Sequence, residues 1–143
     1  MKEYLGQIRV IDKEVYFKLK EREEFKRSRK AIQAVDYSKD LIQSTPENKI
    51  ENAVIKLEEF AREISEKINE MVELKINISK QIDQLENVDE RAVLRLRYVE
   101  HHTWDEVAEE IHFHVTYVHK IHNRALRNFE KVINNEGGWG DVE

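Results

Sequence analysis

The chain has 143 residues and carries 24 Lys and Arg against 29 Asp and Glu, which gives a formal net charge of -5. With only 4 Gly and 1 Pro, it has too few turn-forming residues for a sandwich, a barrel or an alternating α/β fold, so the composition predicts an all-α protein. The absence of cysteine excludes disulfides, thiolate metal sites and a cysteine nucleophile.

The first predicted element is an amphipathic helix from Tyr4 to about Lys30. Its apolar residues recur at helical spacing and mark one narrow buried face. They are Tyr4, Leu5, Ile8, Ile11, Val15, Leu19 and Phe25. The regularity is lost over residues 31–46, where Ser44 or Thr45 can cap a second helix that begins with Pro46.

The second predicted helix, from Pro46 to Glu86, has the clearest periodicity in the sequence. Apolar residues spaced by seven predict a left-handed coiled-coil seam. They are Ile50, Leu57, Ile64, Met71, Ile78 and Leu85, and the second register of the seam is formed by Val54, Ala61, Ile68 and Ile82. A hairpin with the shorter first helix leaves part of this seam uncovered, so we expect a homo-oligomer, with a dimer favoured. The alternative is a monomeric three-helix packing, since heptads do not fix the number of strands.

After Asn87 the pattern changes to short helices. Asp89 can cap a helix that runs to Tyr98 or Val99. Thr103 and Glu106 have the spacing of a capping box at the start of the next helix. The apolar face of that helix is formed by Trp104, Val107, Ala108 and Ile111.

A break at residues 112–114 leads to a last helix, from about Val115 to Ile133. The residues expected on its buried face are Val118, Ile121, Ala125, Phe129 and Val132. A short helix, a three-residue turn and a longer helix predict a helix-turn-helix. The opposite face of the last helix carries donors suited to phosphate oxygens and to base edges in a major groove. These donors are Thr116, Tyr117, His119, Lys120, Asn123, Arg124 and Arg127.

Residues 89–132 resemble region 4 of the sigma-70 family, the helix-turn-helix that reads the -35 promoter element. The resemblance rests on residues 91–98, 103–111 and 115–129, and the whole chain resembles phage late-gene activators of the RinA and ArpU type. It implies that Tyr117, His119 and Lys120 contact bases and that Arg124 and Arg127 contact phosphates. We expect the neighbouring Thr116 to contact bases as well, and Asn123 to contact phosphates. The resemblance also implies a contact with RNA polymerase in a bacterial host cell. The cytoplasm is the expected location, because the sequence has no cysteine, no signal-peptide core and no apolar run of 18 residues.

One position departs from the sigma-70 pattern at the turn. His112 stands where that family usually has Gly, and a left-handed backbone costs a residue other than Gly about 1 kcal/mol. A second departure is the use of His where relatives often carry Arg or Ser, so the DNA sequence that the family reads does not transfer to this chain.

Three parts are therefore expected. Residues 1–86 form a helical hairpin or coiled coil for oligomerisation, residues 87–133 form a DNA-binding helix-turn-helix, and residues 134–143 form a disordered tail with Trp139 as a docking point. The predicted function is a sequence-specific DNA-binding transcription regulator. The alternative is a structural or DNA-packaging adaptor, such as an oligomer similar to a small terminase subunit.

Catalysis, cofactors and a membrane partner are not expected. The sequence has no Gly-rich phosphate loop, no nucleophile elbow and no apolar run of 18 residues. A zinc site is conceivable at His112, His114, His119 and His122, but no carboxylate or thiol completes a recognised spacing, so we expect no metal. We also expect no small-molecule substrate.

Overall fold

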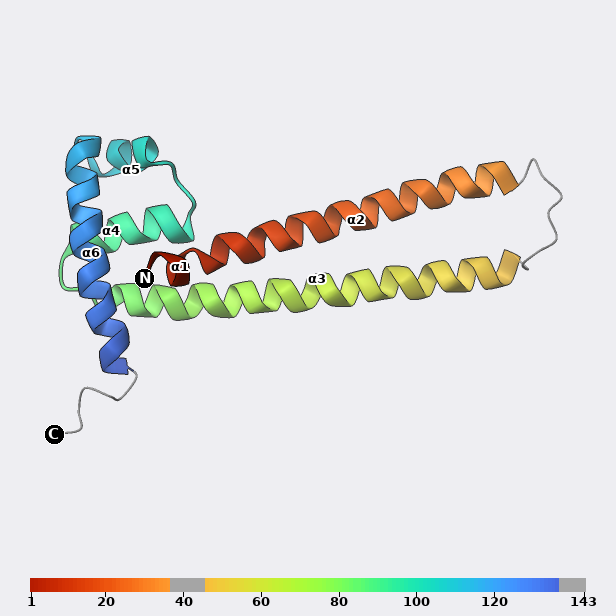
Figure 1. Cartoon of the computed structure of the whole chain (residues 1–143), viewed down its shortest axis with the longest axis horizontal. Coiled ribbons are helices and arrows are strands. Elements are labelled where there is room, and N and C mark those ends of the chain that lie inside the picture. Colours follow the sequence, from red (N-terminus) through yellow and green to blue (C-terminus); the bar gives the residue numbers. More distant parts are fainter. Residues whose placement is uncertain (37–45, 137–143) are drawn as a thin grey trace. The chain divides into compact units, whose positions relative to one another are not determined.

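The computed structural model describes residues 1–36 and 46–136. Within these ranges the chain forms helices and no strand, which confirms the predicted all-α class (Figure 1). The elements are α1 (Lys2–Leu5), α2 (Gln7–Asp36), α3 (Pro46–Asp83), α4 (Val88–Leu94), the π-helical segment η1 (Arg95–Val99), α5 (Trp104–Ile111) and α6 (Val115–Glu136). None of the helices in the described ranges combines the length and the apolar character that a membrane span requires.

The chain divides into two compact units. One consists of Met1–Val10 together with Met71–Glu143, and the other is Ile11–Glu70. The boundary expected between residues 86 and 87 lies inside the first unit. The N-terminal residues and the end of α3 thus belong with the C-terminal helices.

The unit Ile11–Glu70 is an antiparallel pair made by parts of α2 and α3 (Figure 1). Lys67 Nζ lies 2.8 Å from a carboxylate oxygen of Glu14, and Lys18 Nζ lies 3.0 Å from a carboxylate oxygen of Glu63. Further along the pair, the ring centroids of Phe25 and Phe60 are 5.9 Å apart. These contacts run in opposite directions along the two helices, as a hairpin requires. The apolar side chains buried in this unit are Ile11, Val15, Ala53, Phe60 and Ile64.

The register of α3 in this pair differs from the predicted seam. Ile64 is buried and Leu57 half-buried as expected, but Ile50 is exposed, and so is the second register over Val54, Ala61 and Ile68. Ala53 and Phe60, each one residue earlier, are buried instead. Val54, Ala61 and Ile68 thus lie on the part of the predicted seam that α2 leaves uncovered. The apolar arc of α3 is wider than one neighbouring helix covers, and α2 packs on the side that carries the large ring of Phe60.

The other unit is built around a core that joins both ends of the chain. Its buried members are Leu5, Ile8, Ile78, Ile82, Leu85, Leu94, Ala125 and Phe129. Ile78 and Leu85, two of the predicted oligomer-seam residues, are therefore packed within the chain, and Met71 lies half-buried at the edge of the same core. Tyr4 donates a hydrogen bond to Gln81 Oε1 over 2.7 Å, which ties the N-terminus to α3.

The C-terminal helix is longer than expected. The side-chain amides of Gln81 and Gln84 donate to the carboxylate of Glu136 over 2.8 and 2.5 Å. Residues 134–136, which were predicted to belong to a disordered tail, are instead the last turn of α6. The remainder of that predicted tail, including Trp139, lies outside the described residues, as do the predicted caps Ser44 and Thr45.

The cap of α4 is Asn87 rather than Asp89. Asn87 Oδ1 accepts hydrogen bonds from the backbone N–H groups of Asp89 over 2.9 Å and Glu90 over 3.0 Å. An asparagine oxygen satisfies free N–H groups at a helix start as well as an aspartate does, and Asp89 then lies in the first turn, where the helix dipole favours an anion. The helix continues beyond Leu94 with π-helical geometry over η1.

The segment from α5 to α6 agrees closely with the sequence pattern. Thr103 and Glu106 form the predicted capping box, and α6 begins at Val115. His112 ends α5 with φ 61° and ψ 39°, so it adopts the left-handed conformation that Gly would usually supply. A second buried cluster joins α4, α5 and α6, and its members are Val93, Val107, Val118 and Ile121.

Candidate nucleic-acid interface

One face of α6 is buried and the opposite face is exposed. The buried side chains recur every three or four residues, and they are Val118, Ile121, His122, Ala125 and Phe129. All seven residues expected to contact DNA are exposed, namely Thr116, Tyr117, His119, Lys120, Asn123, Arg124 and Arg127. The structure thus brings the predicted contact residues together on the surface of a single helix.

The exposed residues divide into a centre and two flanks. At 3.6 residues per turn, the residues that lie opposite the buried stripe are Thr116, Lys120, Asn123, Arg127 and Lys131. His119 lies on the flank toward α5, where its ring packs on Trp104. Tyr117 and Arg124 lie on the other flank, and Arg124 contacts α4 through Glu90. The centre is accordingly the part of the face with the fewest contacts to the rest of the fold.

Among the helices that follow α3, the cations without a partner in the described chain lie on α6. Within residues 1–36 and 46–136, neither an ion pair nor a hydrogen bond engages the side chains of Lys120, Arg127 and Lys131. They are therefore available to an anionic ligand.

The three arginines that precede α5 each have a partner within the chain. Arg91 donates to the carbonyl oxygens of residues 85 and 86, and Arg95 forms an ion pair with Asp83 at 2.6 Å. Arg97 donates to the carbonyl oxygen of His102 over 3.0 Å, and its guanidinium lies 4.5 Å from the centre of the Trp104 ring. These three cations contact other parts of the chain, so the cations available to a ligand in this region lie on α6.

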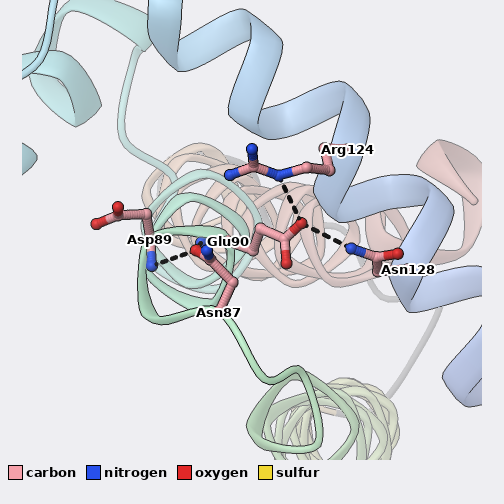
Figure 2. Close-up of polar contacts among 5 residues, drawn as sticks. All are labelled: Asn87, Asp89, Glu90, Arg124 and Asn128. Carbon is pink, nitrogen blue, oxygen red and sulfur yellow. Dashed lines mark hydrogen bonds and ion pairs between the residues drawn. The ribbon is translucent and has the colours of Figure 1, made fainter.

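A buried carboxylate fixes α6 against α4. The side chain of Glu90 is only 3% exposed, and its Oε1 accepts hydrogen bonds from Arg124 Nε over 3.0 Å and from Asn128 Nδ2 over 2.7 Å. Figure 2 shows that the terminal nitrogens of Arg124 point away from Glu90. Arg124 thus compensates a buried negative charge with one nitrogen while its outer edge faces away from α4.

This role of Glu90 was not predicted from the sequence. On a chain in which 37% of the residues are charged, a buried carboxylate has no pattern that separates it from solvated ones. The one available signal was the four-residue spacing of Arg124 and Asn128, which places two donors on the same side of α6.

An aromatic cluster lies between η1, α5 and α6. The Trp104 ring centre is 4.6 Å from the ring of His119 and 4.6 Å from that of His122. The Tyr98 hydroxyl and His122 Nε2 share a hydrogen bond of 2.6 Å. Burial lowers the pKa of His122 to about 4, and the positive charges of Lys2, His119 and Arg97 act in the same direction. His122 is therefore a buried residue that is neutral at neutral pH.

The histidines do not form a recognisable metal site in the part of the chain that the structure covers. Over residues 1–36 and 46–136, no three His, Cys, Asp or Glu side chains are grouped so as to hold a metal ion. His114 instead accepts a hydrogen bond at Nδ1 from the backbone N–H of Thr116 over 3.2 Å, so it acts as a cap of α6.

Two exposed aromatic residues lie at the start of α6. Phe113, in the turn, is 38% exposed, and Tyr117, in the first turn of the helix, is 44% exposed. Their ring centroids are 5.0 Å apart with an interplanar angle of 66°, an edge-to-face contact. From the sequence, residues 112–114 were predicted only to form a turn, and no role was predicted for Phe113.

The family of the chain follows from comparison with known proteins. A family model described as protein of unknown function, DUF1492, matches residues 31–130. The chain belongs to the DUF1492 family. No curated protein and no solved structure matches it.

The DUF1492 match covers α3, α4, η1, α5 and most of α6, so it includes all seven residues expected to contact DNA, whereas Lys131 lies just beyond it. The match is to DUF1492 and not to sigma-70 region 4 or to the RinA and ArpU type.

Proposed function

We propose that this DUF1492 protein is a sequence-specific DNA-binding transcription regulator that inserts α6 into the major groove of double-stranded DNA. The observation that carries the proposal is the exposed polar face of α6, which lies opposite a stripe buried against α4 and α5. A major groove admits one α-helix, and amide, hydroxyl and cationic donors suit both its base edges and the flanking phosphates. The order of α5, a three-residue turn and α6 supports the proposal that they act as a helix-turn-helix.

The residues of the face take different roles in this proposal. In a helix-turn-helix the first turns of the second helix contact base edges, which assigns Thr116, Tyr117, His119 and Lys120 to the bases. Asn123, Arg124 and Arg127 follow further along α6 and are assigned to phosphates. The resemblance of residues 89–132 to sigma-70 region 4 supports the same division, and it adds RNA polymerase as a second partner.

Self-association is part of the proposal because a single chain has little attraction for DNA. The net charge of -5 disfavours nonspecific binding, whereas two linked recognition helices on spaced half-sites add affinity without further contacts. The apolar residues on the exposed side of α3, which are spaced by four and seven, offer a surface for a second copy. They are Ile50, Val54, Ala61 and Ile68. We therefore place the dimer contact beside the hairpin seam rather than in it.

Sedimentation tests the dimer. Ile68→Glu should convert a dimer into a monomer, because it places a charge in an apolar contact. Asn52→Glu adds the same charge at an exposed position on another side of α3 and should leave the dimer intact. A wild-type monomer at micromolar concentration would contradict self-association, and a closed ring of many copies would favour the packaging adaptor.

DNA binding is tested with the full chain and a random duplex library. Selection should enrich one recurring sequence, and anisotropy should then show that Lys120→Ala weakens binding to it by about 1–3 kcal/mol and reduces discrimination against mismatches. Lys13→Ala is the matched control, because it removes the same charge from an exposed position on α2. No enrichment, or an equal loss in the control, would overturn the proposal.

A further inference from the structure

We propose that Phe113 and Tyr117 form an aromatic subsite that recognises the 5-methyl group of thymine in the major groove. This inference rests on the proposed function and names the base that one end of the α6 face reads. The 5-methyl group is the one apolar group that base pairs present in the major groove, and it distinguishes thymine from cytosine there.

The backbone holds Phe113 in place from both sides. On one side, the N–H of Phe113 donates to the carbonyl oxygen of Ala108 over 3.1 Å, and the left-handed His112 directs the chain out of α5. On the other side, the carbonyl oxygen of His114 accepts from the N–H of Tyr117 over 2.9 Å. The ring of Phe113 is thus presented on a fixed turn and not on a long linker.

The two rings are not part of the protein core. Neither Phe113 nor Tyr117 belongs to the two buried clusters of the described chain or to the half-buried side chains that pack against them. Their edge-to-face contact joins them into one apolar surface, although each keeps more than a third of its area exposed. Binding of an apolar group that covers such a surface is favourable, because it removes apolar area from water.

The surroundings of the pair favour DNA over protein as the occupant. Tyr117 lies on α6 directly beside Thr116 and one turn from Lys120, so the apolar surface adjoins hydrogen-bond donors and an unpaired cation. This is the N-terminal end of the helix, which reaches base edges in a helix-turn-helix. A thymine methyl beside a base-edge acceptor and a phosphate has the matching mixture of apolar and acceptor groups.

The test replaces single thymines of the selected duplex by uracil, which removes only the methyl group. With the full wild-type chain, uracil at one or two positions should weaken binding about fourfold, the amount expected for one buried methyl group. With Phe113→Ala the affinity for the thymine duplex should fall by a similar factor, and uracil at the same positions should then have no effect. Tyr117→Phe keeps both rings and should retain the full sensitivity to uracil.

The outcomes separate this inference from the proposed function. If a duplex is selected but uracil changes the wild-type affinity at no position, or if Phe113→Ala remains equally sensitive, the subsite is refuted while DNA binding stands. If no duplex is selected, both fall together. If circular dichroism shows that Phe113→Ala has lost helix, Phe113→Leu replaces it, because leucine keeps an apolar side chain on the same turn. Phe113→Leu should show a reduced sensitivity of DNA affinity to uracil. Unchanged DNA affinity of Phe113→Ala would instead assign the pair to a protein contact.

Discussion

Removing Arg124 should destabilise the fold as well as weaken DNA binding. In Arg124→Ala, the carboxylate of Glu90, whose side chain is 3% exposed, loses the donor at 3.0 Å and keeps only Asn128 at 2.7 Å. A hydrogen bond to a charged group contributes about 1.5–3 kcal/mol, and breaking a fully buried ion pair costs about 3–5 kcal/mol. Because the Arg124 side chain is 46% exposed and Asn128 still donates, we expect a loss of about 2 kcal/mol in the free energy of unfolding.

Urea unfolding followed by circular dichroism measures this loss in a double-mutant cycle. Glu90→Gln removes the buried charge, so adding Arg124→Ala to it should cost about 1–2 kcal/mol less than Arg124→Ala costs alone. Arg127→Ala is the matched control, since Arg127 is an exposed arginine on the same helix and has no ion pair or hydrogen bond among the described residues. It should stay within about 0.5 kcal/mol of wild type. Equal effects of Arg124→Ala and Arg127→Ala on stability would refute the reasoning.

Three further predictions concern the same unit. The pKa of His122 is about 4 in the folded chain and about 6.5 in the unfolded chain. The neutral imidazole therefore stabilises the fold fully above about pH 6.5, and this contribution, at most about 3 kcal/mol, is lost as the pH falls toward 4. Urea midpoints from pH 7.5 to 4.5 should therefore fall more for wild type than for His122→Gln, and parallel curves would contradict the burial of a neutral imidazole. Asn87→Ala should lower the free energy of unfolding by about 1 kcal/mol, and Asn87→Asp should leave it unchanged. A larger loss in Asp89→Ala than in Asn87→Ala would show that Asp89, and not Asn87, is the cap. Arg127→Ala should reduce the slope of log affinity against log salt by about one without changing the preferred DNA sequence, and a changed preference would move Arg127 from the phosphates to the bases.

The C-terminal helices could be predicted closely because their signals are local. The capping box at Thr103 and Glu106 fixes the start of α5, and the three- and four-residue spacing from Val118 to Phe129 fixes which side of α6 is buried. The exposed α6 face follows from that spacing alone. These features depend on residues within two turns of each other, so the sequence contains what is needed to infer them.

The features that were missed depend on residues far apart in the chain. The apolar arc of α3 is wide enough for two registers, and its spacing does not tell that Phe60, which packs on Phe25, is buried while Ala61 is exposed. Glu90 is buried because α6 crosses α4 at Arg124 and Asn128, 34 and 38 residues later. Heptad spacing and charge patterns carry no information about such contacts.

Site-directed cleavage of DNA tests most directly whether α6 enters the groove. The chain contains no cysteine, so Lys131→Cys, on the exposed face of α6, offers a single thiol for an iron-chelate cleavage reagent, and Lys13→Cys on α2 offers the control. We expect the reagent at position 131 to cut both strands at a few adjoining positions within the selected duplex and the reagent at position 13 to leave those positions uncut. Binding of the selected duplex without localised cutting from position 131, or with the same cutting from position 13, would contradict the placement of α6 against the bases.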